Sequence, residues 1–243
     1  MIKLLNVSKE YTTDGQLVVA PVQDVSLGVA PGDFTIITGR SGSGKTTLLN
    51  LVAGLIRPTS GEVFIDDVNV WSIPDKQLSQ LRNRKIGFIF QYPSLLASLT
   101  ALENVALPAS FGLRRKRQDS YERAVELLKL MGLSERMEAY PRQLSAGEQK
   151  RVVIARALMN QPDMVLADEP TSDLDEQTEQ EIMSLLRGIH ATGVTILMVT
   201  HSLELLPFAT RSMRMENGVL QDVVAETNER TANSEARPTE VTT

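Results

Sequence analysis

Apolar and polar residues alternate along residues 2–7 and again along 17–29, and a turn-like TTDG at 12–15 separates the two runs. A period of two places every second side chain on the same face of a strand. The pattern therefore predicts an amino-terminal pair of strands in a small antiparallel sheet.

Further along the chain, short β-rich runs take turns with segments of helical character. The predicted strands are FTIIT at 34–38, GEVFID at 61–66, KIGFIF at 85–90, MVLA at 164–167 and VTILMV at 194–199. Helices are predicted at 45–53, at 75–84 and from Asp175 to about His190. Strands that alternate with helices form parallel βαβ units, so we predict an α/β core.

Between Ala101 and Leu158 the chain carries Leu, Ala, Glu, Lys and Arg at helical spacing, with no β-rich run. This change of character predicts an inserted α-helical subdomain over approximately 95–158. Within it, Ser145 and Glu148 have the spacing of a capping box, in which each side chain binds a backbone N–H of the other residue. A helix is expected to begin there.

The carboxyl-terminal part contains Asn217–Gly218, a two-residue hairpin signal between apolar runs. After Ala225 there is almost no large apolar residue, which is typical of a disordered tail. We predict one domain over 1–224 and a disordered segment over 225–243.

The composition adds limits on function. Among 243 residues, 42% are hydrophobic and 23% charged, which is ordinary for a soluble globular protein. The net charge of −5 argues against a nucleic-acid partner. The absence of cysteine excludes disulfides and thiolate metal sites and fits a reducing compartment. No signal peptide or bilayer-length apolar run is present, so we expect a cytoplasmic chain that reaches a membrane through a partner.

The first candidate site is GRSGSGKT, Gly39 to Thr46, between a predicted strand and a predicted helix. In this context the glycines let backbone N–H groups converge on phosphate oxygens. Lys45 supplies a charge to the β and γ phosphates, and Thr46 supplies a hydroxyl to Mg²⁺. The alternative is a glycine-rich turn without a ligand.

A second candidate is the acidic pair that follows the strand at 164–167. Asp168 is suited to holding Mg²⁺, and Glu169 to orienting or deprotonating the attacking water. Two adjacent acids at a strand end are otherwise a solvated loop. Adjacent carboxylates repel, and a cation relieves that repulsion.

Together these motifs resemble the ATP-binding cassette (ABC) ATPases over nearly the whole chain. GRSGSGKTT resembles the Walker A motif, LSAGEQKR the signature motif, VLADEP the Walker B motif and SDLD at 172–175 the D-loop. The resemblance implies a P-loop NTPase with a RecA-like core, an N-terminal antiparallel β subdomain and the inserted α-helical subdomain. It implies ATP and Mg²⁺ as cofactors. The implied nucleotide-binding residues are Tyr11, Gly39, Ser41, Gly42, Ser43, Gly44, Lys45, Thr46, Thr47, Ser145, Gly147 and Glu148.

Three further residues take their roles from the resemblance. Gln91 matches the Q-loop glutamine, a contact of Mg²⁺ or water that senses the transmembrane partner, and is otherwise a polar strand end. His201 matches the switch histidine that contacts the γ-phosphate, and is otherwise a satisfied histidine beside a helix cap. The implied catalytic residues are Glu169, His201 and Gln91, and the implied metal ligands are Thr46, Gln91 and Asp168. Tyr11 would stack on adenine, or else belong to the core.

In this family two cassettes pack head to tail, and the signature helix of one faces the γ-phosphate bound to the other. Ser145 would donate to that phosphate and Gly147 would permit close backbone approach, so hydrolysis is expected to require a dimer, most simply a homodimer. Three positions depart from the family, one of them Glu148 in place of the glutamine of LSGGQ. Ala146 replaces a glycine of LSGGQ, and Asp173 replaces the usual small residue of the D-loop, adding a charge near the dimer interface.

LRNRKIGFIFQ and the stretch after Gln91 resemble the subfamily of lipoprotein release and macrolide export. Its membrane partner would contact an apolar patch of Tyr92, Pro93, Leu95, Leu96 and Leu99, unless these side chains only pack the helical insert. RRKR at 114–117 is either close to anionic headgroups or a solvated loop.

The expected function is that of an ATPase subunit, peripheral on the inner face of the cell membrane. It would work with integral membrane permease subunits to export or extract a lipoprotein, drug or peptide. The alternatives are a soluble ABC ATPase that acts on DNA or ribosomes, and a nucleotide-gated regulator with little turnover, which Asp173 keeps open.

Overall fold

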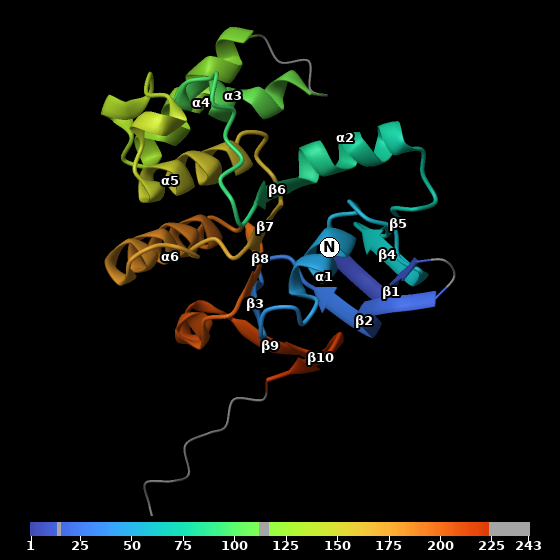
Figure 1. Ribbon diagram of the computed structural model, residues 1–243. Coiled ribbons are helices and arrows are strands. Elements are labelled where there is room, and N and C mark those ends of the chain that lie inside the picture. Colours follow the sequence, from blue (N-terminus) through green and yellow to red (C-terminus); the bar gives the residue numbers. More distant parts are fainter. Residues whose placement is uncertain (14–15, 112–116, 224–243) are drawn as a thin grey trace, which may run out of the picture.

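The computed structural model describes residues 1–13, 16–111 and 117–223. Two β-sheets and a separate group of helices make up the fold (Figure 1). Three predictions lie wholly or partly outside the described residues: the TTDG turn, the RRKR segment and the tail at 225–243.

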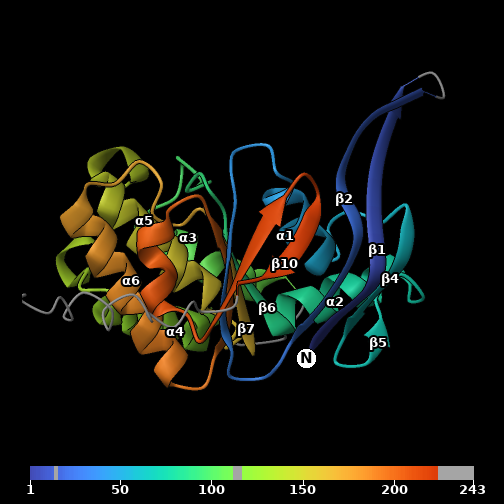
Figure 2. The same ribbon diagram turned by 90° about the horizontal axis from the view of Figure 1, so that it is seen from below.

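The amino-terminal residues form the predicted antiparallel sheet, whose strand order is β2-β1-β4-β5. Its strands are β1 (Ile2–Thr13), β2 (Gln16–Val29), β4 (Ser60–Ile65) and the short β5 (Val68–Asn69). β1 and β2 are longer than predicted and form a ribbon that extends beyond the rest of the molecule (Figure 2). Ile2 and Leu4 on β1 are buried, as the alternation predicted, whereas Val7 is buried out of phase because the register shifts between Leu4 and Val7.

The second sheet has six strands in the order β10-β9-β3-β8-β7-β6. They are β3 (Phe34–Thr38), β6 (Ile86–Ile89), β7 (Met164–Asp168), β8 (Thr195–Thr200), β9 (Arg211–Glu216) and β10 (Val219–Asp222). All neighbours are parallel except β9 and β10, which form the predicted hairpin. Asn217 and Gly218 both have positive φ, 48° and 82°, as a two-residue turn of this type requires.

The helices fall into two groups. α1 (Lys45–Val52), α2 (Asp75–Lys85) and α6 (Glu176–Ala191) accompany the sheets, whereas α3 (Ala101–Ala106), α4 (Arg117–Leu130) and α5 (Ala146–Ala157) form the helical insert (Figure 1). Short 3₁₀ helices lie at Leu107–Ser110, Ser134–Arg136, Pro141–Gln143 and Leu203–Phe208. Within the described ranges, every helix is too short or too polar to cross a bilayer.

Several strand boundaries differ from the prediction, and two of them have a clear physical reason. The strand predicted at 85–90 covers Ile86–Ile89, because Lys85 completes α2 and its ammonium pairs with Asp66 and Asp163 at 3.1 and 2.5 Å. The strand predicted at 61–66 ends at Ile65, because Asp66 adopts a φ of 48°, outside the range of a strand.

The core consists of two clusters of buried apolar side chains. In one, α1 packs between the two sheets, and its residues Leu48, Leu49 and Leu51 are fully buried. The other joins the helical insert to α6 and the opposite face of the six-stranded sheet. Burying one such leucine stabilises the fold by about 1.5–3 kcal/mol, so α1 and the loop before it are held firmly against both sheets.

Candidate nucleotide site

The loop from β3 to α1 has the sharp curvature of a phosphate cradle. Gly44 has a φ of 103°, and a Cβ atom there would lie 1.9 Å from the carbonyl oxygen of Pro21. A Cβ atom on Gly39 would lie 2.4 Å from the carbonyl oxygen of Met215. Both positions therefore exclude any other residue. Gly44 is also the N-cap of α1, and no side chain of the described residues caps it, which leaves backbone N–H groups for a ligand.

A cavity of about 470 Å³ lies over this loop. Its described lining consists of Pro21, Ser41, Gly42, Gly44, Lys45, Thr46, Thr47, Gln91, Glu169 and His201. Gln91, Glu169 and His201 follow the carboxyl ends of β6, β7 and β8, and the loop itself follows β3. Because these four strands are parallel neighbours, their ends meet at one edge of the sheet, where α/β folds bind ligands.

Lys45 lines the cavity and is only 6% exposed. Its ammonium donates to the carbonyl oxygens of Gly39 at 2.7 Å and Arg40 at 3.1 Å, and lies 3.7 Å from Oε1 of Glu169. A cation held this way beside backbone N–H groups is suited to phosphate oxygens.

Thr46 and Asp168 supply adjacent oxygen atoms. The Thr46 hydroxyl donates to Oδ1 of Asp168 at 3.1 Å. Burial raises the pKa of Asp168 above its usual value, the hydrogen bond from Thr46 opposes this rise, and the neighbouring charge of Glu169 adds to it. Hydroxyl and carboxylate oxygens are ligands that Mg²⁺ prefers, and a cation would relieve the cost of burying the charged carboxylate. These two residues therefore fit a magnesium ion.

Glu169 is held in an unusual backbone conformation, with a φ of 46°. The peptide N–H of Glu169 donates to the carbonyl oxygen of Val199. The carbonyl oxygen of Glu169 accepts from both the backbone N–H and the hydroxyl of Ser172. Its Oε2 lies 2.8 Å from Nδ1 of His201. A strained residue that its surroundings hold in place is a feature of functional sites, and here the carboxylate lies between Lys45 and His201.

The signature segment begins α5 with the predicted capping box. Ser145 Oγ accepts from the N–H of Glu148 at 3.2 Å, and Glu148 Oε2 accepts from the N–H of Ser145 at 2.8 Å. The backbone N–H of Ser145 and the charge of Arg136 lower the pKa of Glu148. Because the Ser145 hydroxyl acts here as an acceptor, its own O–H stays available to donate.

A packing contact within the chain explains why residue 147 is a glycine, and the sequence did not reveal it. A Cβ atom there would lie 2.7 Å from the Cγ2 methyl of Thr178, in the first turn of α6. Asp175 fixes Thr178 by accepting from its N–H at 3.0 Å and its hydroxyl at 2.7 Å. The glycine thus allows α5 and α6 to approach each other closely, whatever it also does at an interface.

Several predicted site residues lie away from the cavity. Ser145 and Ala146 are exposed, and neither they nor Glu148 belong to its described lining. Tyr11 is on β1, 44% exposed, with the Lys9 ammonium 5.0 Å from its ring centroid, so it is not a core residue. Its stacking on adenine stays a prediction. Gly39 is half-buried and Ser43 is buried, and neither belongs to the described lining. Asp173 is an exposed residue with a φ of 66°.

Two cations on α5 were missed by the sequence analysis. Lys150, 4% exposed, donates to the carbonyl oxygen of Gln91 at 2.5 Å, and Arg156 donates to those of Pro93 and Ser94 at 3.0 and 2.9 Å. They clamp the segment after β6 to the signature helix. No signal in the sequence separates them from ordinary basic residues on a solvated helix face, because their acceptors lie more than fifty residues away.

Lys150 also faces the acidic residues of the site. Burial lowers the pKa of its ammonium, and the charges of Asp173, Asp168 and Glu169 oppose that shift. A charged hydrogen bond contributes about 1.5–3 kcal/mol. We therefore expect Lys150→Met to lower kcat for ATP about tenfold or more, because the Gln91 segment loses its tether.

The measurement is steady-state phosphate release, with thermal unfolding recorded in parallel. An apolar side chain of similar length in a buried place need not destabilise the fold, so kcat should fall without a matching loss of Tm. Lys129→Met, at an exposed position of α4, is the matched control. An unchanged kcat in Lys150→Met would show that the clamp has no part in turnover.

The comparison with known families agrees with this geometry. The sequence profile of the ABC transporter family matches residues 22–172. The chain belongs to the ABC transporter family. It is an ATPase of that family, and the predicted fold class is confirmed.

Among related ABC proteins, MJ0796 of Methanocaldococcus jannaschii, an uncharacterized ABC transporter ATP-binding protein, is 43% identical over 91% of this chain and 95% of its own. The lipoprotein-releasing system ATP-binding protein LolD of Buchnera aphidicola is 39% identical, over 90% and 96% of the two chains. The macrolide export ATP-binding/permease protein MacB of Aggregatibacter actinomycetemcomitans is 43% identical over 96% of this chain, which spans only 35% of that longer protein.

A solved ABC structure extends the likeness to three dimensions. The dimeric structure of the MJ0796 cassette in a post-hydrolysis state, bound to ADP and Pi, matches with a TM-score of 0.84 and 40% identity. The match covers 91% of this chain and 98% of the other. These relatives confirm the predicted ATP binding and the predicted resemblance to the lipoprotein-release and macrolide-export subfamily.

Proposed function

We propose that this chain is the ATP-hydrolysing subunit of a transporter, that it pairs with a second copy around Mg-ATP, and that the pair drives integral membrane permease subunits in export or extraction. The observation that carries the proposal is an incomplete site. The P-loop cavity contains Lys45, Glu169 and His201, whereas the signature residues Ser145 and Gly147 of the same chain lie outside its described lining. A second chain would supply them.

In this proposal each cavity residue has one task. Lys45 binds the β and γ phosphates, and Thr46 and Asp168, with Gln91 nearby, hold Mg²⁺. The ion, when bound, neutralises phosphate charge. Glu169 accepts the proton of the attacking water, since its carboxylate points into the cavity. His201, 2.8 Å from Oε2 of Glu169, orients that carboxylate and contacts the γ-phosphate.

Ser145 and the start of α5 would act on the nucleotide of the partner subunit. The Ser145 O–H can donate while its oxygen keeps the bond from Glu148, and a helix amino terminus favours an anion. The solved MJ0796 cassettes are dimeric, which supports this arrangement. Asp173, exposed in the D-loop, would add a negative charge near that interface and keeps a slow, regulatory ATPase as the second candidate.

The membrane partner would contact a groove of about 510 Å³ between α2, β6 and the helical insert. Phe88 and Phe90 stack there with ring centroids 4.1 Å apart, and Phe111, also in the lining, is 62% exposed. Tyr92 of the predicted patch is 69% exposed, whereas Leu95 packs against the core. Exposed aromatic residues around a groove are typical of an interface. This supports a peripheral place on the inner face of the membrane.

Mixing two inactive variants tests the composite site. Lys45→Ala and Ser145→Arg should each hydrolyse little ATP alone, because both sites of each dimer are damaged. Together they form one site with an intact Lys45 from one chain and an intact Ser145 from the other. We expect the mixture to recover part of the phosphate release and to photocrosslink an azido-ATP analogue.

The matched control mixes Ser145→Arg with the double variant that carries both changes, in which no intact site can form. If the first mixture is no more active than this control, the two residues do not act across a dimer interface. Cargo is a separate question, for which the names LolD and MacB suggest lipoproteins or macrolides.

A further inference from the structure

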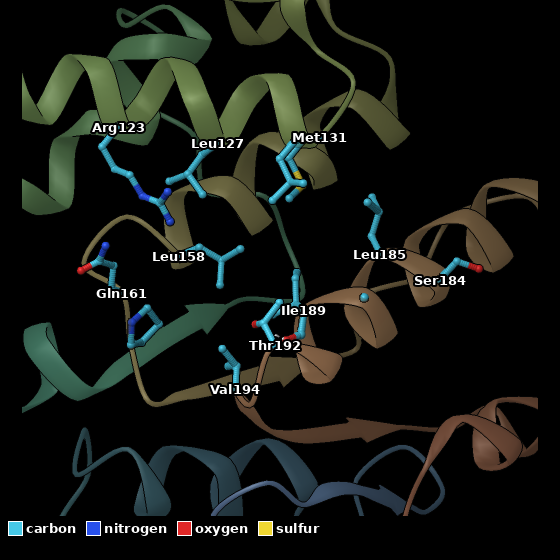
Figure 3. Close-up of a pocket in the computed structure, with 13 residues that line it drawn as sticks. Arg123, Leu127, Met131, Leu158, Gln161, Ser184, Leu185, Ile189, Thr192 and Val194 are labelled. Atoms are coloured by element: carbon cyan, nitrogen blue, oxygen red, sulfur yellow. Dashed lines mark hydrogen bonds between the residues drawn. The ribbon is translucent and has the colours of Figure 1, made fainter.

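A second cavity, of about 530 Å³, lies between the helical insert and the core, on the side of α6 (Figure 3). Its volume is within the range of small-molecule sites, about 300–1,000 Å³. Its described lining is entirely different from that of the nucleotide cavity: Arg123, Leu127, Leu130, Met131, Leu158, Gln161, Pro162, Ser184, Leu185, Gly188, Ile189, Thr192 and Val194. Most of these side chains are apolar, and Leu130 is 64% exposed.

One end of this cavity is polar. Arg123 on α4 directs its guanidinium into the cavity, and Gln161 lies at the same end (Figure 3). Nη1 of Arg123 pairs with Glu126 at 3.1 Å, but its Nε is buried and has no hydrogen-bond partner among the described residues. A buried N–H group is unfavourable without an acceptor. An anionic oxygen at this end would become the acceptor once the Arg123 side chain, which is 32% exposed, turns toward it.

Gly188 points to the same cavity independently. It lies inside α6, where glycine is less favourable than alanine. A close packing contact does not explain it, since a Cβ atom there would meet no atom of the described residues within 4 Å. The missing side chain instead leaves the cavity open. Gly188 belongs to the described lining of this cavity, so a larger side chain at this position would occupy part of its volume.

We propose that this cavity binds a small amphiphile with an anionic head group. Its apolar body would lie against Leu127, Leu158 and Ile189, and its head group would accept from Nε of Arg123. α4 belongs to the helical insert and α6 to the core, so the ligand would contact both and restrain one relative to the other. Since α5 of the insert carries the signature residues, occupancy would change the rate of ATP hydrolysis.

Isothermal titration of the full chain with decanoate, below its micelle concentration, tests the proposal. Uncharged decanol and cationic decyltrimethylammonium have the same apolar length and isolate the effect of charge. We expect one decanoate per chain, at least tenfold tighter than either analogue, and a changed steady-state ATPase rate at saturation. Arg123→Gln should remove the preference for decanoate over decanol, whereas Arg187→Gln, at an exposed position of α6 outside the lining, should leave it intact.

Gly188→Leu places a side chain in the cavity and should abolish binding of decanoate and its effect on ATPase rate, while basal hydrolysis stays unchanged. Gly188→Ala, which is more favourable in a helix and fills little of the cavity, shows whether the position tolerates substitution. Decanoate that binds no tighter than decanol, or that binds equally to Gly188→Leu, would overturn the proposal. So would a cationic amphiphile of equal affinity.

Discussion

Replacing Glu169 with glutamine will lower steady-state ATP hydrolysis by about 100-fold or more. General-base catalysis contributes about 10²–10⁴-fold, and an amide cannot accept the proton of the attacking water. The substitution conserves size, so the positive φ of 46° and the contact with His201 at 2.8 Å need not change. Binding of ATP should therefore persist, and the variant should accumulate as an ATP-bound dimer.

Phosphate release measures the first part of this prediction, and size-exclusion chromatography with and without ATP measures the second. Glu176→Gln makes the same chemical change at an exposed position in the first turn of α6 and should leave the rate unaltered. Wild-type turnover by Glu169→Gln would show that another group takes the proton. Loss of ATP binding in that variant would instead show that the Glu169 carboxylate contributes to binding of ATP and not to the hydrolysis step.

Replacing Lys45 with alanine will weaken ATP binding by about two orders of magnitude. The Lys45 side chain is 6% exposed and lines the cavity, where its ammonium can donate to phosphate oxygens. Each charged hydrogen bond is worth about 1.5–3 kcal/mol, and two of them account for a loss of this size. Titration with a fluorescent ATP analogue measures the change directly.

The same ammonium also holds the loop through the carbonyl oxygens of Gly39 and Arg40. Lys45→Arg keeps the positive charge. If the affinity for nucleotide depends on this charge, Lys45→Arg should bind nucleotide more tightly than Lys45→Ala. Lys76→Ala, at an exposed position of α2, is the neutral control. Unchanged affinity in Lys45→Ala, with an unchanged Tm, would remove Lys45 from the binding site.

Local signals in the sequence predicted the elements well. The capping box of Ser145 and Glu148, the Asn217–Gly218 turn and the alternation along β1 each depend on residues within a few positions of one another. Such signals fail at boundaries that a distant residue decides. Lys85 ended α2 where a strand was predicted, because its partners are Asp66 and Asp163.

The candidate site divides in the same way. The glycines of the cradle and the residues Lys45 and Thr46 form a continuous stretch whose spacing alone carries the chemistry. Asp168 and Glu169 could be chosen because they follow a buried strand. By contrast, neither the pairing of Glu169 with His201 nor the bond from Thr46 to Asp168 is visible before the parallel strands are placed side by side.

The sequence by itself therefore determined that this chain has an α/β core, a glycine-rich loop between a strand and a helix, and a capped helix that begins at Ser145, since all three follow from short-range spacing. Only the tertiary structure decided that Lys150 and Arg156 bind the segment after β6. The same holds for the close approach of Gly147 to Thr178 and for the cavity that Gly188 and Arg123 line. The physical reason is distance along the chain. Burial and hydrogen bonding between residues far apart depend on how the sheet and the helical insert pack, and no local pattern records that packing.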